Sequence, residues 1–161
     1  MKKSLLVLIV IVFFTCPSLK GQTANAKEES AIKAVIEGEI KASFAGDYNT
    51  WTSFFVQEPY LVWMQASKEM NVCWKGWQEV STNVKNAFKP ERKGSIIHNG
   101  NSDYTIRFYN NGAFVTFKCK ITNISNGQST QLEAWEARLL ENQSGKWKIA
   151  YLSSIYTSTY K

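Results

Sequence analysis

The chain has 161 residues, of which 44% are hydrophobic and 14% aromatic, and its formal net charge is +6. That length fits one domain, since typical domains hold about 100–150 residues, and the apolar content excludes a largely disordered chain. Lysine and arginine are scattered among acidic residues without a long basic run, which argues against nucleic acid as a partner.

The first 21 residues are predicted to be a secretory signal peptide. Lys2 and Lys3 provide a positive start, and the stretch from Leu5 to Phe14 is an unbroken apolar run. Such a run is too short to cross a bilayer as a helix, which needs about 20 residues, but it has the length and flanks of a signal peptide. Removal of this segment takes away three lysines and no acid, so the net charge falls from +6 to +3.

Two cleavage positions compete. Cleavage near Gly21 is favoured by its distance from the apolar run, whereas Ala24 and Ala26 fit the small-x-small rule but lie further downstream. Lipidation of Cys16 is a less favoured third route. The sequence therefore predicts an exported protein, periplasmic or secreted, with no membrane span and a single domain over residues 27–161.

Three helices are predicted in the first half of the chain, over residues 27–46, 48–56 and 75–89. The first has an apolar face at helical spacing, formed by Ile32, Val35, Ile36 and Ile40. Gly46 is suited to end this helix, and Asp47 is suited to cap the second one.

Strands are predicted between and after these helices. Residues 60–64 form a continuous apolar run of the kind that is covered on both faces, and residues 68–71 are predicted to be a polar turn. From Ser95 onward the hydrophobic period is two, which predicts long strands joined by turns that contain Asn or Gly. These strands cover residues 104–109, 113–122, 132–142 and 146–157. Long antiparallel neighbours of this kind twist strongly and can bend around helices.

Four stretches resemble the nuclear transport factor 2-like superfamily, the cystatin-like α+β cone, and most nearly its polyketide cyclase and steroid isomerase-like branch. They are Ala45-Gly46-Asp47, the stretch from Trp51 to Trp63, Trp74-Lys75-Gly76-Trp77, and Arg138-Leu139-Leu140 with Gly145-Lys146-Trp147-Lys148-Ile149. The resemblance implies an α+β fold with three N-terminal helices in the concave face of a strongly bent antiparallel sheet. It also implies a homodimer through the outer sheet face. It does not fix an activity, because the superfamily includes isomerases, dehydratases, polyketide cyclases and non-catalytic binding subunits.

Three positions carry the chemistry in steroid isomerases of this superfamily: a carboxylate base, a tyrosine donor and a protonated aspartate donor. By the resemblance, the base falls at Trp63, the tyrosine at Glu39 and the aspartate near Trp135. None of the three residue types is kept, which argues against the same isomerase mechanism.

Glu39 is a candidate acid or base for a separate reason. It falls near the middle of the apolar face of the first helix, and a carboxylate there costs several kcal/mol unless it is paired, hydrogen-bonded or protonated. An inward carboxyl with a raised pKa could do acid/base work in a lined cavity. The alternative is that Glu39 pairs with Arg138 or a lysine, or reaches solvent.

The candidate ligand site contains four further residues. The resemblance to the superfamily implies that Trp63 and Trp135 lie on the pocket side with Glu39, where two indoles and a carboxylate suit a flat or cationic organic ligand. Ser43 lies close to the same helical line as Glu39, and Tyr104 is expected to add a hydroxyl. Arg138, on the opposite strand face to Trp135, is expected to point outward towards a partner subunit.

The remaining signals concern cysteine and metal. Cys73 and Cys119 stay after cleavage and could form one disulfide, or Cys119 could fill the core as a free thiol. His98 is the single histidine, and no paired Cys or His occurs at ligand spacing, so no metal or cofactor is predicted.

Taken together, these observations predict an exported domain that binds a small organic molecule. Any catalysis would be cofactor-free proton transfer of the isomerase, dehydratase or cyclase type. The alternative is a non-catalytic dimeric binding or protein-interaction module.

Overall fold

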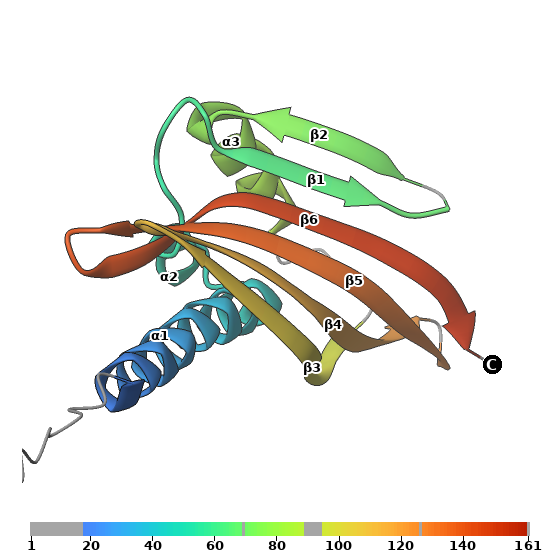
Figure 1. The fold of residues 1–161 in the computed structure, drawn as a ribbon. Coiled ribbons are helices and arrows are strands. Elements are labelled where there is room, and N and C mark those ends of the chain that lie inside the picture. The colour runs from blue at the N-terminus through green and yellow to red at the C-terminus, as the bar shows by residue number, and fades with distance from the viewer. Residues whose placement is uncertain (1–17, 69, 89–94, 126, 161) are drawn as a thin grey trace, which may run out of the picture.

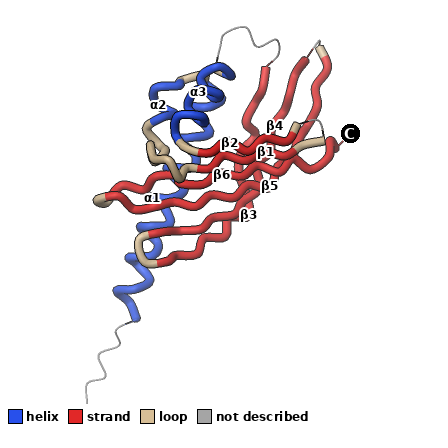
Figure 2. The backbone as a smooth tube through the Cα atoms, turned by 90° about the horizontal axis from the view of Figure 1, so that it is seen from above, coloured by secondary structure: helices blue, strands red, loops and turns tan. Residues whose placement is uncertain are grey.

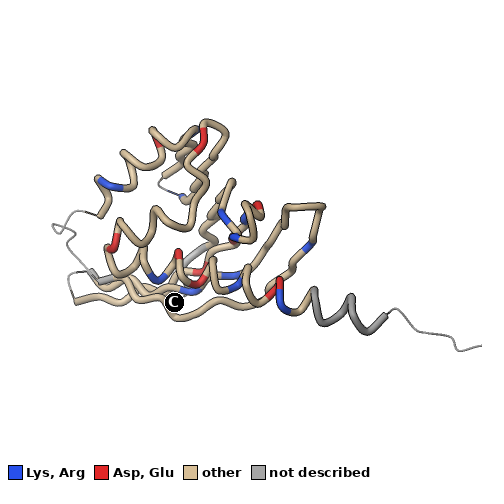
Figure 3. Tube along the Cα trace, turned by 90° about the vertical axis from the view of Figure 1, so that its left-hand side faces the viewer, with Lys and Arg blue, Asp and Glu red and all other residues tan. Residues whose placement is uncertain are grey.

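The computed structural model describes residues 18–68, 70–88, 95–125 and 127–160. The predicted apolar run and Cys16 lie outside these residues. Positions of both charge signs are interspersed along the trace (Figure 3). Within the described part of the chain, no helix has the length and apolar character needed to cross a membrane.

The three predicted helices are present with altered ends. They are α1 (Ser18–Ala45), α2 (Tyr48–Thr52) and α3 (Trp77–Ala87). α1 begins before residue 27 because residues 18–27 contain no proline and several good helix formers. Gly46 follows α1 with φ +69°, and the Asp47 carboxylate accepts a hydrogen bond of 3.0 Å from the Thr50 amide, so the predicted stop and cap are confirmed.

Six strands form one sheet in the order β2-β1-β6-β5-β4-β3. Their bounds are β1 Val62–Ala66, β2 Asn71–Lys75, β3 Ser95–Tyr109, β4 Gly112–Ser125, β5 Gln128–Gln143 and β6 Lys146–Tyr160. All neighbours are antiparallel except β1 and β6, which run parallel. The sheet is therefore mixed, with one parallel pairing among otherwise antiparallel neighbours.

The strand β2 is absent from the sequence prediction. Residues 71–75 pair with β1, so that Met64 lies opposite Cys73, and this pairing supplies the strand that local propensity does not. The third helix consequently begins at Trp77. Gly76 precedes it with φ +80°, and its amide donates to the Leu61 carbonyl at 2.7 Å.

The helices pack against one face of the open sheet, which gives the α+β architecture expected of the cone fold. Figure 1 shows β3 to β6 as long curved strands with α1 across them, and Figure 2 shows α3 close to the β1–β2 hairpin. On the α1 side, Ile32, Ile36 and Ile40 are buried, as their helical spacing predicts. They meet the inward side chains of the sheet in a single apolar core.

Alternation along the strands separates an inner from an outer face. On β4 the inner positions include Val115, Phe117 and Cys119, which are all buried. On β5 the inner face carries the buried side chains of Glu136 and Arg138. Two charged residues therefore enter the interior from the middle of the sheet, opposite α1.

Candidate functional site

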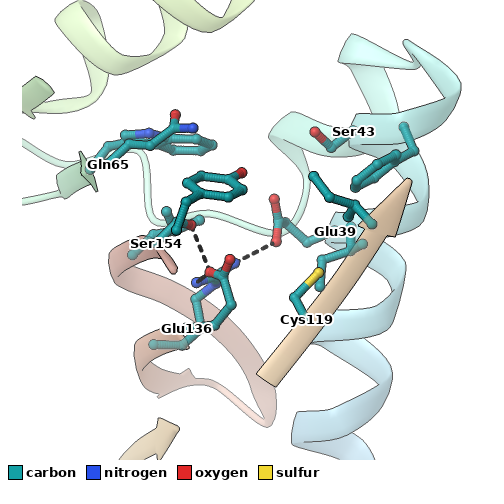
Figure 4. Close-up of a pocket in the computed structure, with 13 residues that line it drawn as sticks. Glu39, Ser43, Gln65, Cys119, Glu136 and Ser154 are labelled. Atoms are coloured by element: carbon teal, nitrogen blue, oxygen red, sulfur yellow. Dashed lines mark hydrogen bonds and ion pairs between the residues drawn. The ribbon is translucent and has the colours of Figure 1, made fainter. Parts of the chain in front are cut away.

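A partly open cavity of about 80 Å³ lies between α1 and the inner face of the sheet. Its lining comes from α1, β1, β4, β5 and β6 and consists of Glu39, Ile40, Ser43, Phe44, Trp63, Gln65, Cys119, Ile121, Glu136, Arg138, Leu152, Ser154 and Tyr156. Figure 4 shows several of these side chains directed toward one another. The cavity is smaller than the roughly 150 Å³ that admits benzene in an engineered apolar cavity.

Glu39 reaches this cavity from α1 and has only 2% of its surface exposed. The Trp51 indole donates a hydrogen bond of 3.2 Å to its Oε1, and Arg138 Nη2 lies 3.4 Å from its Oε2. Trp51 is itself fully buried on α2, so the short second helix holds the first carboxylate oxygen in place.

Arg138 connects Glu39 to a second carboxylate. Its Nη1 lies 2.7 Å from Glu136 Oε2, and the Ser154 hydroxyl donates to that same oxygen at 2.7 Å. These two contacts are shorter than the 3.4 Å contact between Arg138 and Glu39. One buried guanidinium therefore bridges two buried carboxylates, and its stronger contact is with Glu136.

Burial controls the protonation of Glu39. Loss of solvent raises the pKa of this carboxyl above its usual range, and the nearby Arg138 guanidinium lowers it by a smaller amount. The Glu136 carboxylate opposes ionisation as well. The net effect is a raised pKa, which favours a carboxyl that can hold a proton closer to neutral pH than a solvated glutamate can.

Two buried donors at the cavity have no hydrogen-bond partner within the described residues: Trp63 Nε1 and Arg138 Nε. A buried donor without a partner costs about 1–3 kcal/mol, so such groups commonly meet a water or a ligand oxygen. Both belong to cavity-lining side chains. They add donor capacity to a wall that otherwise presents carboxylates.

The structure brings three of the five predicted site residues together. Glu39, Ser43 and Trp63 line the cavity. Tyr104 does not: its hydroxyl donates to Glu37 Oε1 at 2.6 Å, and its ring stacks on Phe117.

The predicted orientation of β5 is wrong. Trp135 is 46% exposed on the outer face, where Lys118 Nζ lies 4.8 Å from the centre of its ring, whereas Arg138 is buried in the interior. Glu136 and Arg138 do share one strand face, as their spacing predicts. The inward face is the other one, because the ion pairs of Arg138 with Glu39 and Glu136 allow the charged face to be buried.

Sequence reasoning missed Glu136, Ser154 and Trp51 as site residues. Of these, Glu136 could have been predicted. It lies two positions before Arg138 on the same strand, so if the Arg138 side chain points inward, that of Glu136 does as well. Ser154 and Trp51 offer no comparable pattern, since a lone serine in a strand and a tryptophan in a short helix are ordinary core residues.

Cys73 and Cys119, the cysteines among the described residues, are both free, which agrees with the alternative that Cys119 fills the core as a free thiol. Cys73 is exposed on β2, and Cys119 is buried beside the cavity. Burial, with a smaller effect from Glu136, raises the pKa of the Cys119 thiol to about 12. Among the residues that the structure describes, no three His, Cys, Asp or Glu side chains are grouped so that they could hold a metal ion.

Comparison with known proteins gives a fold but no close relative. No family model matches the chain, and no curated protein matches it. Among solved structures, the hexachlorocyclohexane dehydrochlorinase LinA-type3 from Novosphingobium barchaimii LL02 is similar at a TM-score of 0.69 and 15% identity, covering 86% of this chain and 92% of that one. A CaMKII hub from S. rosetta is similar at a TM-score of 0.65 and 16% identity, covering 81% and 95%. An NTF-2-like protein of unknown function from Shewanella oneidensis MR-1 is similar at a TM-score of 0.59 and 16% identity, covering 80% and 98%.

Proposed function

This chain has the nuclear transport factor 2-like fold, and from that premise we propose that it is an exported protein that binds a small organic molecule in the cavity beside Glu39. Solved structures with this fold include a named dehydrochlorinase and a named hub, so the fold alone does not decide between an enzyme and an assembly module. The observation that carries the proposal is a buried carboxyl with a raised pKa at the wall of a cavity.

The proposed chemistry is cofactor-free proton transfer. A carboxyl whose pKa is raised towards neutrality can exchange a proton with a substrate near neutral pH, which a solvated glutamate does poorly. Trp51 and Arg138 fix its two oxygens in position. Glu39 is thus the proposed acid or base, Trp63 the flat wall that orients the ligand, and Ser43 a further polar contact.

The test is a metabolite screen with two variants of the same helix. Trp51 bonds Glu39 and Trp63 lines the cavity, so tryptophan fluorescence reports on ligand binding there. Glu39→Gln should abolish ligand-induced changes in this fluorescence and in melting temperature, together with any turnover. Glu37→Gln is the matched control, since Glu37 is an exposed carboxylate on α1 that bonds Tyr104 and does not line the cavity. A screen in which no compound shifts the unmodified protein would remove the proposal.

A second candidate function is assembly through the outer sheet face. That face presents an outer patch, defined here as Met64, Phe114, Trp135, Leu139 and Ile155, which are all exposed. Trp135 lies opposite Ile155 in the β5–β6 register, and Phe114 lies opposite Leu139 in the β4–β5 register. Exposed apolar side chains gathered on one sheet face are typical of a protein interface, so we propose that two copies of the chain pair through them.

The proposed export depends on the N-terminal sequence alone. Lys2, Lys3 and the apolar run from Leu5 to Phe14 support it, and they lie outside the described residues. Expression in a bacterial host followed by N-terminal sequencing of the exported protein tests it. A mature chain starting at Gln22 or Lys27 is expected, and a cytoplasmic chain that keeps Met1 would contradict it.

A further inference from the structure

The charges that line the cavity point to the kind of ligand it takes. Resting on the proposed binding function, we propose that the cavity accepts a small organic cation, an ammonium or methylated ammonium group, and that Glu39 is its counter-charge. The proposal follows from three observations: the balance of charge among the cavity-lining residues, the contacts that Arg138 already makes with carboxylates, and the aromatic side chains in the cavity wall.

The described lining holds more negative than positive groups. Its ionisable carboxylates are Glu39 and Glu136, and Arg138 is its one lysine or arginine. Arg138 lies 2.7 Å from Glu136, and Ser154 adds a hydrogen bond to the same oxygen, so this pair is well matched. Glu39 has a longer contact of 3.4 Å with the guanidinium. When both carboxylates are ionised, the excess negative charge therefore lies at Glu39.

An anionic ligand is disfavoured by the same contacts. Both terminal nitrogens of Arg138 are already directed at carboxylates, Nη1 at Glu136 and Nη2 at Glu39, so its unpartnered Nε and Trp63 Nε1 are left as donors for a water or a neutral ligand oxygen. With Glu39 protonated, Glu136 already neutralises this guanidinium, so a carboxylate or phosphate ligand would bring an uncompensated negative charge into a site shielded from water. Such an uncompensated buried charge is costly, whereas a cation would restore neutrality.

Aromatic side chains complete the site for a cation. Phe44, Trp63 and Tyr156 line the same cavity as the two carboxylates. Ring faces attract ammonium groups, more strongly where water is excluded. A cavity of about 80 Å³ is too small to enclose a benzene-sized group, so a methylated ammonium head group would lie partly in its open side, with the remainder of a longer molecule outside.

Binding of a cation is expected to release a proton. The groups that face Glu39 are Trp51 from α2, Glu136 and Arg138 from β5, Cys119 from β4 and Tyr156 from β6. Without a ligand, burial raises the pKa of Glu39 and favours its protonated form. A cation beside Glu39 stabilises the ionised form, so the bound state gives up that proton and affinity rises with pH until Glu39 is ionised in the free protein as well.

Three probes of one shape and different charge test the inference on the full chain. They are choline, its neutral isostere 3,3-dimethyl-1-butanol and the anion 3,3-dimethylbutanoate, each titrated by calorimetry with tryptophan fluorescence as a second readout. Choline should bind about tenfold more tightly than the alcohol, or better, and the anion should give no signal. Choline titrations in two buffers of different ionisation enthalpy should show net proton release.

The variants separate charge from shape. Glu39→Gln should reduce the preference for choline over the alcohol to within about twofold, whereas Glu37→Gln should keep it. Equal or tighter binding of the alcohol or the anion would overturn the cation inference and leave the proposed binding function intact. If none of the three probes binds but another compound from the metabolite screen does, the cation inference is likewise overturned and the proposed binding function is left intact. Absence of binding by every compound would overturn both.

Discussion

Glu39 on α1 and Arg138 on β5 are 99 positions apart in the chain and meet at 3.4 Å in the interior. Glu136 approaches the same guanidinium at 2.7 Å from the sheet side. One arginine thus ties the first helix to the middle of the sheet through two buried carboxylates. Because ions are expensive to bury, this arrangement makes the free energy of unfolding depend on which of these three groups carry a charge.

The first prediction concerns Arg138→Met. Removing the guanidinium leaves Glu39 and Glu136 buried without a counter-charge, and breaking a buried pair in this way costs roughly 3–5 kcal/mol. Urea unfolding at pH 7 measures the loss. Arg107→Met is the matched control, since Arg107 is an exposed arginine on β3, and it should change the free energy of unfolding by less than about 0.5 kcal/mol.

A rescue experiment completes this test. Combining Arg138→Met with Glu39→Gln and Glu136→Gln removes all three charges and should recover more than half of the lost stability, because the cost arises from unpaired carboxylates rather than from lost volume. Failure of the triple variant to recover stability would show that the packing of the arginine, not its charge, holds the helix to the sheet.

The second prediction uses the raised pKa of Glu39. A carboxyl whose pKa is higher in the folded state stabilises the fold fully at pH values below its unfolded pKa, and this contribution is lost as pH rises through the folded pKa. Glutamine cannot ionise, so the free energy of unfolding of Glu39→Gln should rise relative to that of the unmodified protein as the pH increases from about 5 to about 8. Urea unfolding of both proteins across that range measures the difference. A difference that is flat with pH, or one that favours the unmodified protein at high pH, would contradict the raised pKa.

Periodicity predicted most of the fold for identifiable reasons. The burial of Ile32, Ile36 and Ile40 on α1 and of alternate residues on β4 follows from spacings of 3.6 and 2. The strand β2 was beyond such reasoning, because the segment 71–75 has only five residues, has no alternation of polar and apolar side chains, and depends on pairing with β1. Local pattern does not contain that tertiary partner.

The site was harder to predict because alternation fixes which residues share a face and leaves open which face is inside. Trp135 and Arg138 necessarily point to opposite sides of β5. Hydrophobicity favours the tryptophan as the inward residue. The interior instead holds the arginine, since Glu39 from a distant helix and Glu136 compensate its charge. The pairing of Glu39 with Arg138 is the alternative predicted from the sequence, and the structure confirms it, whereas the parts of Glu136 and Ser154 are visible only once α1 and the sheet are brought together.

The third prediction concerns the outer patch. Trp135→Lys and Ile155→Lys place charges on facing positions of β5 and β6, and they should weaken the proposed dimer about thirtyfold or more, as expected for central interface residues. Sedimentation over a range of protein concentrations measures this. Met70→Lys, an exposed apolar residue outside the patch, is the control. An unmodified protein that sediments as a monomer throughout would contradict the interface.

The fourth prediction distinguishes the two cysteines of the folded domain. Cys73 is exposed on β2, whereas Cys119 is buried and the pKa of its thiol is raised to about 12, so its reactive thiolate is scarce in the native state. In a chain carrying Cys16→Ser, a thiol reagent at pH 8 should modify Cys73 rapidly and Cys119 only after urea is added. Adding Cys73→Ser should remove the fast phase and leave the slow one. If both thiols react fast, β4 opens readily next to the cavity. If neither thiol reacts fast, Cys73 is bridged. The rate at Cys119 therefore also reports on how firmly the cavity wall beside Glu39 is closed.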